Sequence, residues 1–253
     1  MDITDDAGIR TLTLDRPDVK NALTPEIAVD IAEAIEDAEA DINDAIVLTG
    51  AGDAFCSGGD IVAMAERDWP ADERSHIVES TFGYLAEAML AADVPIVARV
   101  NGDAVGAGLS LVLLSDFAYA VEDARFNAGF ARVGLIPDSG GTFLLPQIVG
   151  LRAAKRLVLA AEFVGADEAA ELGLVSEAVS AAELDAAVED CLNRLQLLPT
   201  ETLGRVRRAM HENLGRPYRD GLSNEALWQA EAYATEAHRE GVAAFLDRHG
   251  ADE

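Results

Sequence analysis

The sequence is poor in basic residues, and above all in lysine. Its 253 residues carry 46 acidic and 19 basic side chains, a formal net charge of -27, and lysine occurs only as Lys20 and Lys155. Binding to nucleic acid phosphates requires a positive field, and attraction to an anionic membrane surface requires clusters of Lys and Arg. The composition therefore disfavours nucleic acid and anionic membranes as partners.

The acidic residues are spread along the whole chain rather than gathered in one tail, as at Glu36, Asp37, Asp41 and Asp44. One interpretation is an acidic face that docks a cationic partner. The other is a general adaptation to high salt, in which dense surface carboxylates keep the protein soluble. The dispersal and the scarcity of lysine favour the second interpretation and predict a halophilic source.

Cysteine and long apolar runs are also scarce. Cys56 and Cys191 cannot form a disulfide framework, so a reducing cytosol is the expected compartment. No apolar run approaches the roughly 18 residues of a membrane span, and residues 1–6 lack the basic and apolar parts of a signal peptide. We therefore expect a soluble, cytoplasmic protein.

Hydrophobic residues make up 50% of the chain, and their periodicity divides it into two parts. Up to residue 120, short apolar strands alternate with helical segments, which is typical of an α/β fold with largely parallel sheets. The expected strands are residues 9–14, 45–49, 95–100, 116–120 and 125–127. The expected C-terminal helices are residues 181–197, 200–213, 218–237 and 240–248. We predict an α/β core over 1–190 and a helical region over 191–253.

Two glycine-bearing turns are the main candidates for a functional site. Residues 57–60 (SGGD) and 106–108 (GAG) each follow a strand-like segment and enter an expected helix. Backbone amides at a helix start point outward and can hold a negative charge. Downstream, Asp138 is a lone carboxylate between Pro137 and a glycine pair. An anion-binding turn and one isolated acid suggest an enzyme that forms and reprotonates a carbanion or enolate.

Spacing disfavours several other chemistries. The glycine turn lacks the third glycine of a dinucleotide-binding motif, and residues 108–112 (GLSLV) lack the last glycine of a nucleophile elbow, so Ser110 is expected to be a small helix residue. The histidines have no metal-ligand spacing. Cys56 has no base or cation beside it in the sequence, so we expect it to pack within a loop. No metal or redox cofactor is expected.

Taken together, the motifs make the chain resemble the crotonase (enoyl-CoA hydratase/isomerase) superfamily over nearly its whole length. The segments that carry the resemblance are residues 16–17 (RP), 21–23 (NAL), 54–61 (AFCSGGDI), 100–102 (VNG), 106–108 (GAG), 134–142 (GLIPDSGGT) and 169–175 (AAELGLV). The resemblance implies a spiral of β-β-α turns with a helical C-terminal region used in trimerisation, and trimers that often pair into hexamers. It also implies an acyl-CoA thioester as substrate.

In this family two backbone N–H groups hold the thioester oxygen as it becomes an enolate. The matching motifs assign these donors to Gly59 and Ala107, and losing one such donor typically costs on the order of 3 kcal/mol. The hydratases of the family carry two glutamates that handle the water, and Ser110 and Phe130 occupy those positions here. Neither residue replaces a carboxylate base, so ordinary hydration is disfavoured.

Asp138 matches the acid that serves as the single base in the family's double-bond isomerases. Residues 126–141 most resemble the ring-1,2-epoxyphenylacetyl-CoA isomerase branch. Asp138 would move a proton between two carbons of one conjugated system, with a pKa raised by burial, while Phe130 and Leu109 exclude water. Four alternatives stay open: a helix N-cap role for Asp138, a hydratase using another carboxylate or a placed water, a dehalogenase-like reaction, and a non-catalytic acyl-CoA binding subunit.

The resemblance implies a wider set of substrate and CoA contacts. Arg16 and Lys20 flank the segment that lies along the CoA in this family, and Arg248 sits in a C-terminal helix that can close over a neighbouring subunit's ligand. The remaining predicted binding residues are Ala22, Ser57, Asp60, Ile61 and Phe130. The acyl group stays open, because pocket depth depends on the helices of residues 61–90.

Overall fold

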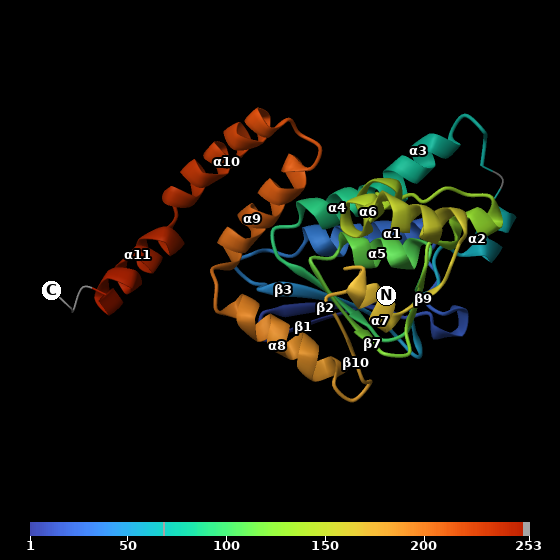
Figure 1. Cartoon of the computed structure of the whole chain (residues 1–253), viewed down its shortest axis with the longest axis horizontal. Helices are drawn as coiled ribbons and strands as arrows, with labels where there is room; N and C mark the ends of the chain where they lie inside the picture. The colour runs from blue at the N-terminus through green and yellow to red at the C-terminus, as the bar shows by residue number, and fades with distance from the viewer. Residues whose placement is uncertain (68, 250–253) are drawn as a thin grey trace.

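A six-stranded sheet forms the middle of the molecule. A computed structural model describes residues 1–67 and 69–249, and Figure 1 shows how their elements are arranged. In spatial order the strands are β1 (Asp2–Asp6), β2 (Ile9–Leu14), β3 (Ala45–Gly50), β5 (Ile96–Val100), β7 (Phe117–Val121) and β10 (Glu177–Val179). All neighbours are parallel except β1 and β2. Strand β3 is buried along its whole length, as expected for a parallel strand covered on both faces.

The described residues also form a second, smaller sheet. Its order is β4 (Ala54–Cys56), β6 (Asp103–Val105), β8 (Arg125–Asn127) and β9 (Val164–Gly165), with only the β8–β9 pair antiparallel. Each of β3, β5 and β7 is followed by a strand of this sheet, and then the chain becomes helical. This repeat of two strands and a helix confirms the predicted α/β spiral of β-β-α turns.

Helices cover one face of the large sheet and enclose the main core (Figure 1). Those that contribute buried side chains to this core are α1 (Pro25–Glu36), α4 (Tyr84–Ala91), α5 (Ala107–Leu114), α6 (Gly141–Leu159) and α7 (Ala166–Glu171). The short helices α2 (Ile61–Glu66) and α3 (Arg74–Val78) have no buried residue. A π-helical turn, Glu79–Gly83, joins α3 to α4, and 3-10 turns occupy Pro17–Val19 and Gly129–Val133. Helix α5 is buried at every position, so its first turn is fixed within the core.

The C-terminal helices are α8 (Leu184–Gln196), α9 (Thr200–Asn213), α10 (Tyr218–Tyr233) and α11 (Glu236–His249). Helix α8 packs on the opposite face of the large sheet, against residues of β3, β5 and β7. Helix α9 is anchored by Arg207, which pairs with Asp116 at 2.9 Å and donates to main-chain oxygens of the α4 end. Helices α10 and α11 reach away from the core (Figure 1). The division predicted at residue 190 stays a prediction, because α8 runs across this position.

Three details of the predicted elements are wrong. Cys56 ends strand β4 and does not lie in a loop. The predicted helix 218–237 ends at Tyr233, because the Thr235 hydroxyl accepts the His238 N–H at 3.1 Å and so caps α11. Strands β1, β4, β6, β9 and β10 were not predicted. None of the described helices is long and apolar enough to cross a membrane.

Candidate active site

The two glycine turns lie side by side because the strands before them are neighbours. Strands β4 and β6 are parallel, so the segments that follow them leave the small sheet at the same edge. Gly58 has φ +98°, and a Cβ atom placed on it would lie 2.7 Å from the Val105 oxygen and 3.5 Å from the Ala107 nitrogen. Only glycine permits this backbone conformation and this close approach.

The Gly59 N–H points away from Leu23, the residue that pairs with Gly59 in an isolated parallel bridge. Leu23 donates its N–H to the Gly58 oxygen at 2.7 Å and accepts the Asp60 N–H at 2.8 Å, as in a short parallel bridge. In such a bridge the N–H of the central residue, here Gly59, faces the opposite side. On that side Gly59 lines a cavity of about 300 Å³.

Ala107 presents the second amide to the same cavity. It is the first residue of α5, so its N–H lies outside the hydrogen-bond ladder of the helix. Gly106 precedes it with φ 55° and ψ -120°, a conformation that favours glycine. Within the described part of the chain, the Gly59 and Ala107 amides have no protein acceptor. Two unpaired amides, one at a helix start, form a site suited to an oxyanion.

Asp138 lines both this cavity and a larger one of about 680 Å³. It lies in the loop before α6, and the Ser139 hydroxyl donates to its Oδ1 at 3.4 Å. Burial raises the pKa of Asp138 above its ordinary value, and the Ser139 hydrogen bond partly opposes this. A carboxyl group with a raised pKa beside an oxyanion site is suited to taking up and returning a proton.

The N-cap alternative for Asp138 is wrong. Helix α6 begins at Gly141, and the residue at its N-cap is Gly140 in the left-handed region at φ 76°. The Gly141 N–H binds the main-chain oxygen of Asp138 at 2.7 Å, and no side-chain cap is formed. The carboxylate of Asp138 is therefore left to face the cavities.

Ser110 and Phe130 lie close to the site but supply no acid. Ser110 is 2% exposed on α5, and its hydroxyl donates to the main-chain oxygen of Asp138 at 3.5 Å. Phe130 lines the smaller cavity together with Gly59 and Ala107. The two positions at which the resemblance would place the glutamates of a hydratase thus hold a hydroxyl near the main chain of Asp138 and an aromatic ring in the smaller cavity.

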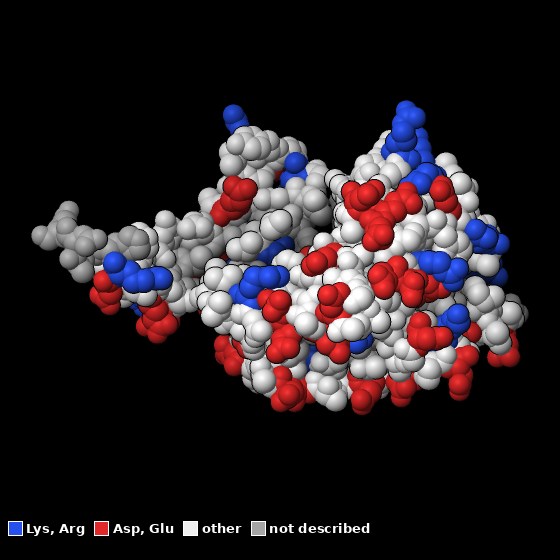
Figure 2. Space-filling view, turned by 60° about the horizontal axis from the view of Figure 1, so that its bottom comes forward, with Lys and Arg blue, Asp and Glu red and all other residues white. Residues whose placement is uncertain are grey.

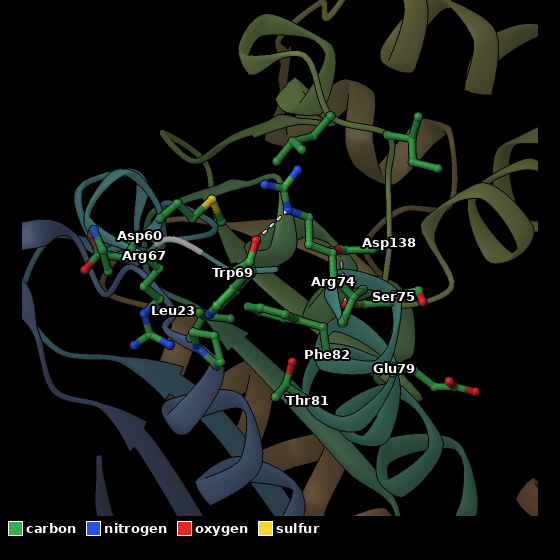
Figure 3. A pocket seen from close by; sticks show the side chains of 18 residues that line it. Leu23, Asp60, Arg67, Trp69, Arg74, Ser75, Glu79, Thr81, Phe82 and Asp138 are labelled. Atoms are coloured by element: carbon green, nitrogen blue, oxygen red, sulfur yellow. Dashed lines mark hydrogen bonds between the residues drawn. The ribbon is translucent and has the colours of Figure 1, made fainter. Parts of the chain in front are cut away.

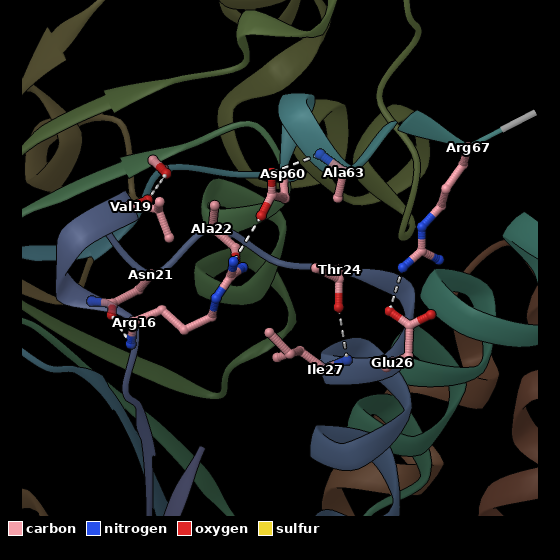
Figure 4. Close-up of polar contacts among 11 residues, drawn as sticks. Arg16, Val19, Asn21, Ala22, Thr24, Glu26, Ile27, Asp60, Ala63 and Arg67 are labelled. Atoms are coloured by element: carbon pink, nitrogen blue, oxygen red, sulfur yellow. Dashed lines mark hydrogen bonds and ion pairs between the residues drawn. The ribbon is translucent and has the colours of Figure 1, made fainter. Parts of the chain in front are cut away.

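Two other carboxylates among the described residues line the larger cavity, and neither is suited to act as a base. Asp60 accepts the Ala63 N–H at 3.0 Å as the cap of α2 and pairs with Arg16 at 2.9 Å (Figure 4). These contacts lower the pKa of Asp60. Glu79 belongs to the π-helical turn, and Figure 3 shows its side chain directed away from the cavity.

The larger cavity is walled mainly by apolar side chains of the segment between α2 and α4 and of the loop before Asp138 (Figure 3). Residues of this wall to which the sequence assigned no role include Met64, Trp69, Arg74, Phe82, Leu135 and Ile136. They come from helices and loops that are far apart in the sequence, so only the fold identifies them as cavity residues. The cavity has the size and polarity of a site for an acyl group.

The predicted CoA residues are only partly brought together. Ser57 and Ile61 line the smaller cavity, and the Ser57 hydroxyl donates to the Val19 oxygen at 3.1 Å. Lys20 is exposed on the neighbouring turn and has no carboxylate partner in the described ranges. Ala22 is 7% exposed and offers its main-chain oxygen to Arg16.

Arg16 and Arg248 have other surroundings. The Arg16 guanidinium is bound to Asp60 and to the Ala22 oxygen. Arg248 lies on α11, at the far end of the molecule from α2 (Figure 1), and donates to the Ala244 oxygen of its own helix. A contact between Arg248 and the ligand of a neighbouring subunit stays a prediction.

Cys56 and the histidines show no catalytic arrangement. Cys56 is fully buried, and burial raises the pKa of its thiol to about 12, so it is a packing residue. No three His, Cys, Asp or Glu side chains within residues 1–67 and 69–249 are grouped as metal ligands. Chemistry without a resident metal or redox cofactor stays a prediction.

A spiral of β-β-α turns with two unpaired amides and one half-buried acid beside an apolar cavity is the arrangement expected of a protein of the crotonase type. Residues 4–252 match the enoyl-CoA hydratase/isomerase family, and the chain belongs to that family.

Individual relatives support the assignment at full length. The chain is 37% identical to a protein of Rhodobacter capsulatus named "probable enoyl-CoA hydratase", over 95% of this chain and 92% of the relative. It is 33% identical to the 1,2-epoxyphenylacetyl-CoA isomerase of Escherichia coli, over 94% and 92%. The crystal structure of an enoyl-CoA hydratase from Mycobacterium smegmatis superposes with a TM-score of 0.89 at 29% identity, covering 97% of this chain and 95% of that one.

Proposed function

We propose that the protein is an acyl-CoA isomerase with a single acid/base, Asp138. The observation that carries this proposal is the set of carboxylates at the cavities, in which Asp60 is held by Arg16 and Glu79 points away. Ser110 and Phe130 provide no second acid to activate water. A site with one free acid suits the transfer of a proton within one molecule better than the addition of water.

In the proposed reaction the Asp138 carboxylate removes a proton from a carbon next to the double bond. The electron pair moves through the conjugated system to the thioester oxygen, which becomes an enolate oxygen bound by the amides of Gly59 and Ala107. The Asp138 carboxylic acid then returns the proton to a different carbon of the same system, and the thioester carbonyl re-forms. The apolar wall and Phe130 limit the access of water to the enolate.

The 33% identical relative from Escherichia coli is named 1,2-epoxyphenylacetyl-CoA isomerase. This name favours a ring-epoxide of a phenylacetyl-type CoA ester as one substrate of the present protein, which would rearrange it to an oxepin. A simple shift of the double bond in an enoyl-CoA uses the same site. We propose substrates of these two kinds, with the acyl group in the cavity of about 680 Å³.

Hydration is the competing activity, because the 37% identical relative is named a hydratase. It would require a water placed by Asp138 or by another carboxylate. The deciding experiment incubates the wild-type protein with 3-enoyl-CoA and 2-enoyl-CoA esters of matched length in ¹⁸O-labelled water. We expect interconversion of the two esters with little labelled 3-hydroxyacyl-CoA. Rapid formation of labelled 3-hydroxyacyl-CoA would establish the hydratase, and ligand binding without either product would establish a binding subunit.

We also propose a homotrimer or a dimer of trimers. Helices α10 and α11 extend from the core, and several of their apolar side chains are exposed, including Leu227 at 68% and Leu246 at 60%. A second copy of the chain is a suitable cover for this surface. Light scattering after gel filtration checks this, and a monomeric mass at micromolar concentration would contradict it.

A further inference from the structure

The orientation of the Gly59 amide is set by one hydrogen bond to the preceding residue. The Gly58 C=O and the Gly59 N–H belong to the same planar trans peptide, so they point in opposite directions. Leu23 donates its N–H to the Gly58 oxygen at 2.7 Å. Whatever fixes the Leu23 N–H therefore fixes the direction in which the Gly59 N–H enters the cavity.

The peptide that carries the Leu23 N–H is itself held by Arg16. Arg16 donates one terminal N–H to the Ala22 oxygen at 2.6 Å, and this oxygen belongs to the same peptide as the Leu23 N–H. A line of hydrogen bonds thus runs from the guanidinium through the Ala22–Leu23 peptide to the Gly58–Gly59 peptide. Aligned hydrogen bonds of this kind strengthen one another.

The second terminal N–H of Arg16 reaches the other side of Gly59. It pairs with Asp60 Oδ2 at 2.9 Å, while the Asp60 N–H binds the Leu23 oxygen at 2.8 Å and Asp60 Oδ1 caps α2. Figure 4 shows Arg16 between Ala22 and Asp60. The guanidinium therefore joins the residue before Leu23 to the residue after Gly59.

The segment that carries Arg16 is firmly attached to the core. Asn21 is 1% exposed, accepts the Arg16 N–H at 2.9 Å and donates to the oxygens of Ala51 and Ala54 at 2.9 Å. The side chain of Asp60 is 11% exposed and that of Arg16 is 34% exposed, so the pair is partly shielded from water. Such a network holds a group in place better than an isolated surface ion pair does.

We infer that the ion pair of Arg16 and Asp60, with its bond to the Ala22 oxygen, is a clamp that orients the Gly59 amide toward the thioester oxygen. Arg16 is then a positioning residue of the oxyanion site and not a ligand of the CoA phosphates. The inference rests on the proposed use of the Gly59 and Ala107 amides to bind a thioester oxygen. It does not depend on which reaction follows.

The test measures how strongly the site polarises a bound thioester. A saturated acyl-CoA with ¹³C at the thioester carbonyl is bound to the wild-type protein, and its carbonyl stretch is recorded by isotope-edited infrared difference spectroscopy. We expect the stretch to fall to lower frequency on binding, because two N–H donors withdraw electron density from the C=O bond.

Arg16→Met keeps the aliphatic stem and removes both donors of the clamp. We expect this variant to lose most of the carbonyl shift and to turn over about 10- to 100-fold more slowly, the effect of a misplaced oxyanion donor. Its dissociation constant for the saturated ester should stay within about threefold of wild type, a difference of less than 1 kcal/mol.

Asp60→Asn is the second variant, because Asn caps a helix as well as Asp does. It should lose part of the shift without unfolding α2.

Arg10→Met is the matched control. Arg10 also pairs with one carboxylate, Asp5, and donates to one main-chain oxygen, that of Ala34, but it lies near the start of β2, whereas Arg16 follows the end of this strand. We expect wild-type polarisation and turnover in this variant.

Arg16→Lys should restore only part of the carbonyl shift, because a single ammonium group does not reproduce the two N–H donors of the guanidinium.

The outcomes separate the clamp from the proposed reaction. Arg16→Met with the full carbonyl shift would overturn the clamp. An unchanged shift with roughly tenfold weaker binding would also overturn it and would assign Arg16 to the CoA phosphates. A wild-type protein that polarises the ester in an Arg16-dependent way but isomerises no enoyl-CoA would leave the clamp standing and refute the isomerase proposal.

Discussion

At the scale of single residues, the surroundings of Asp138 determine its chemistry. The half-buried carboxyl group lines two cavities, and its partial burial raises its pKa. Ser139 follows Asp138 in the turn before α6 and has a backbone φ of 49°. Its hydroxyl donates a hydrogen bond to Asp138 Oδ1 at 3.4 Å. The pKa of Asp138 is therefore raised by its partial burial and lowered, to a smaller extent, by the Ser139 hydroxyl.

This balance predicts the effect of Ser139→Ala on the pH dependence of turnover. The proposed base acts as the carboxylate, so kcat/KM falls as the pH drops through the pKa of Asp138. Removing the hydroxyl removes a contact that lowers this pKa, so the acid limb should move to higher pH. A pH–rate profile of kcat/KM measures the shift, and an unmoved or lowered acid limb would contradict this role of Ser139.

The sequence located Asp138, Gly59 and Ala107 because each belongs to a motif whose residues are local. It did not reveal the pairing of Arg16 with Asp60, because the partners are 44 residues apart and are joined only by the fold. Both residues were instead interpreted as ligands of the substrate. The contacts of a charged side chain depend on tertiary structure, and a single sequence does not contain them.

At the scale of elements, the close packing of α5 against β4 places the Ala107 amide. A Cβ atom on Gly108 would lie 2.2 Å from the Cys56 oxygen and 2.8 Å from the Cys56 Cβ. The helix therefore approaches the strand more closely than any side chain allows. This contact determines how far the start of α5 lies from the turn that carries Gly59.

Gly108→Ala should consequently destabilise the protein by about 1–3 kcal/mol, the usual range for forcing an extra carbon into a packed core. Gly165→Ala is the control, because nothing lies within 4 Å of its added Cβ. Urea unfolding of both variants measures the difference. Equal stabilities would show that α5 and β4 can move apart at little energetic cost.

The elements that the sequence missed are short strands whose pairing defines them. Strand β1 has the sequence DITDD and is exposed at every position, so it carries no alternation of apolar and polar residues. It pairs with β2 because Ala7 and Gly8, at φ 47° and 82°, form a tight two-residue turn. Strand β6 has only three residues. By contrast, β3 was predicted at nearly its observed bounds, since its apolar run is continuous.

At the scale of the whole molecule, the surface charge is dense and of one sign. On the face shown in Figure 2, acidic side chains spread across the body of the molecule and along its lower edge. The formal net charge of -27 implies strong mutual repulsion in dilute buffer. Salt at about 1 M shortens the Debye length to about 3 Å and screens this repulsion.

The protein should therefore unfold at a higher temperature in molar KCl than in salt-free buffer. Thermal unfolding at increasing KCl measures the effect, and sucrose at matched osmolality separates charge screening from general exclusion of a solute. Full stability without salt would refute the predicted adaptation to high salt.

The central claim is that Asp138 alone moves the proton, and Asp138→Asn tests it most directly. The variant keeps the shape of the side chain and removes the base, so isomerisation of a 3-enoyl-CoA should fall about 10²- to 10⁴-fold. Binding of a saturated acyl-CoA, measured by calorimetry on the same preparation, should remain close to wild type. Isomerisation at the wild-type rate by Asp138→Asn would contradict the account.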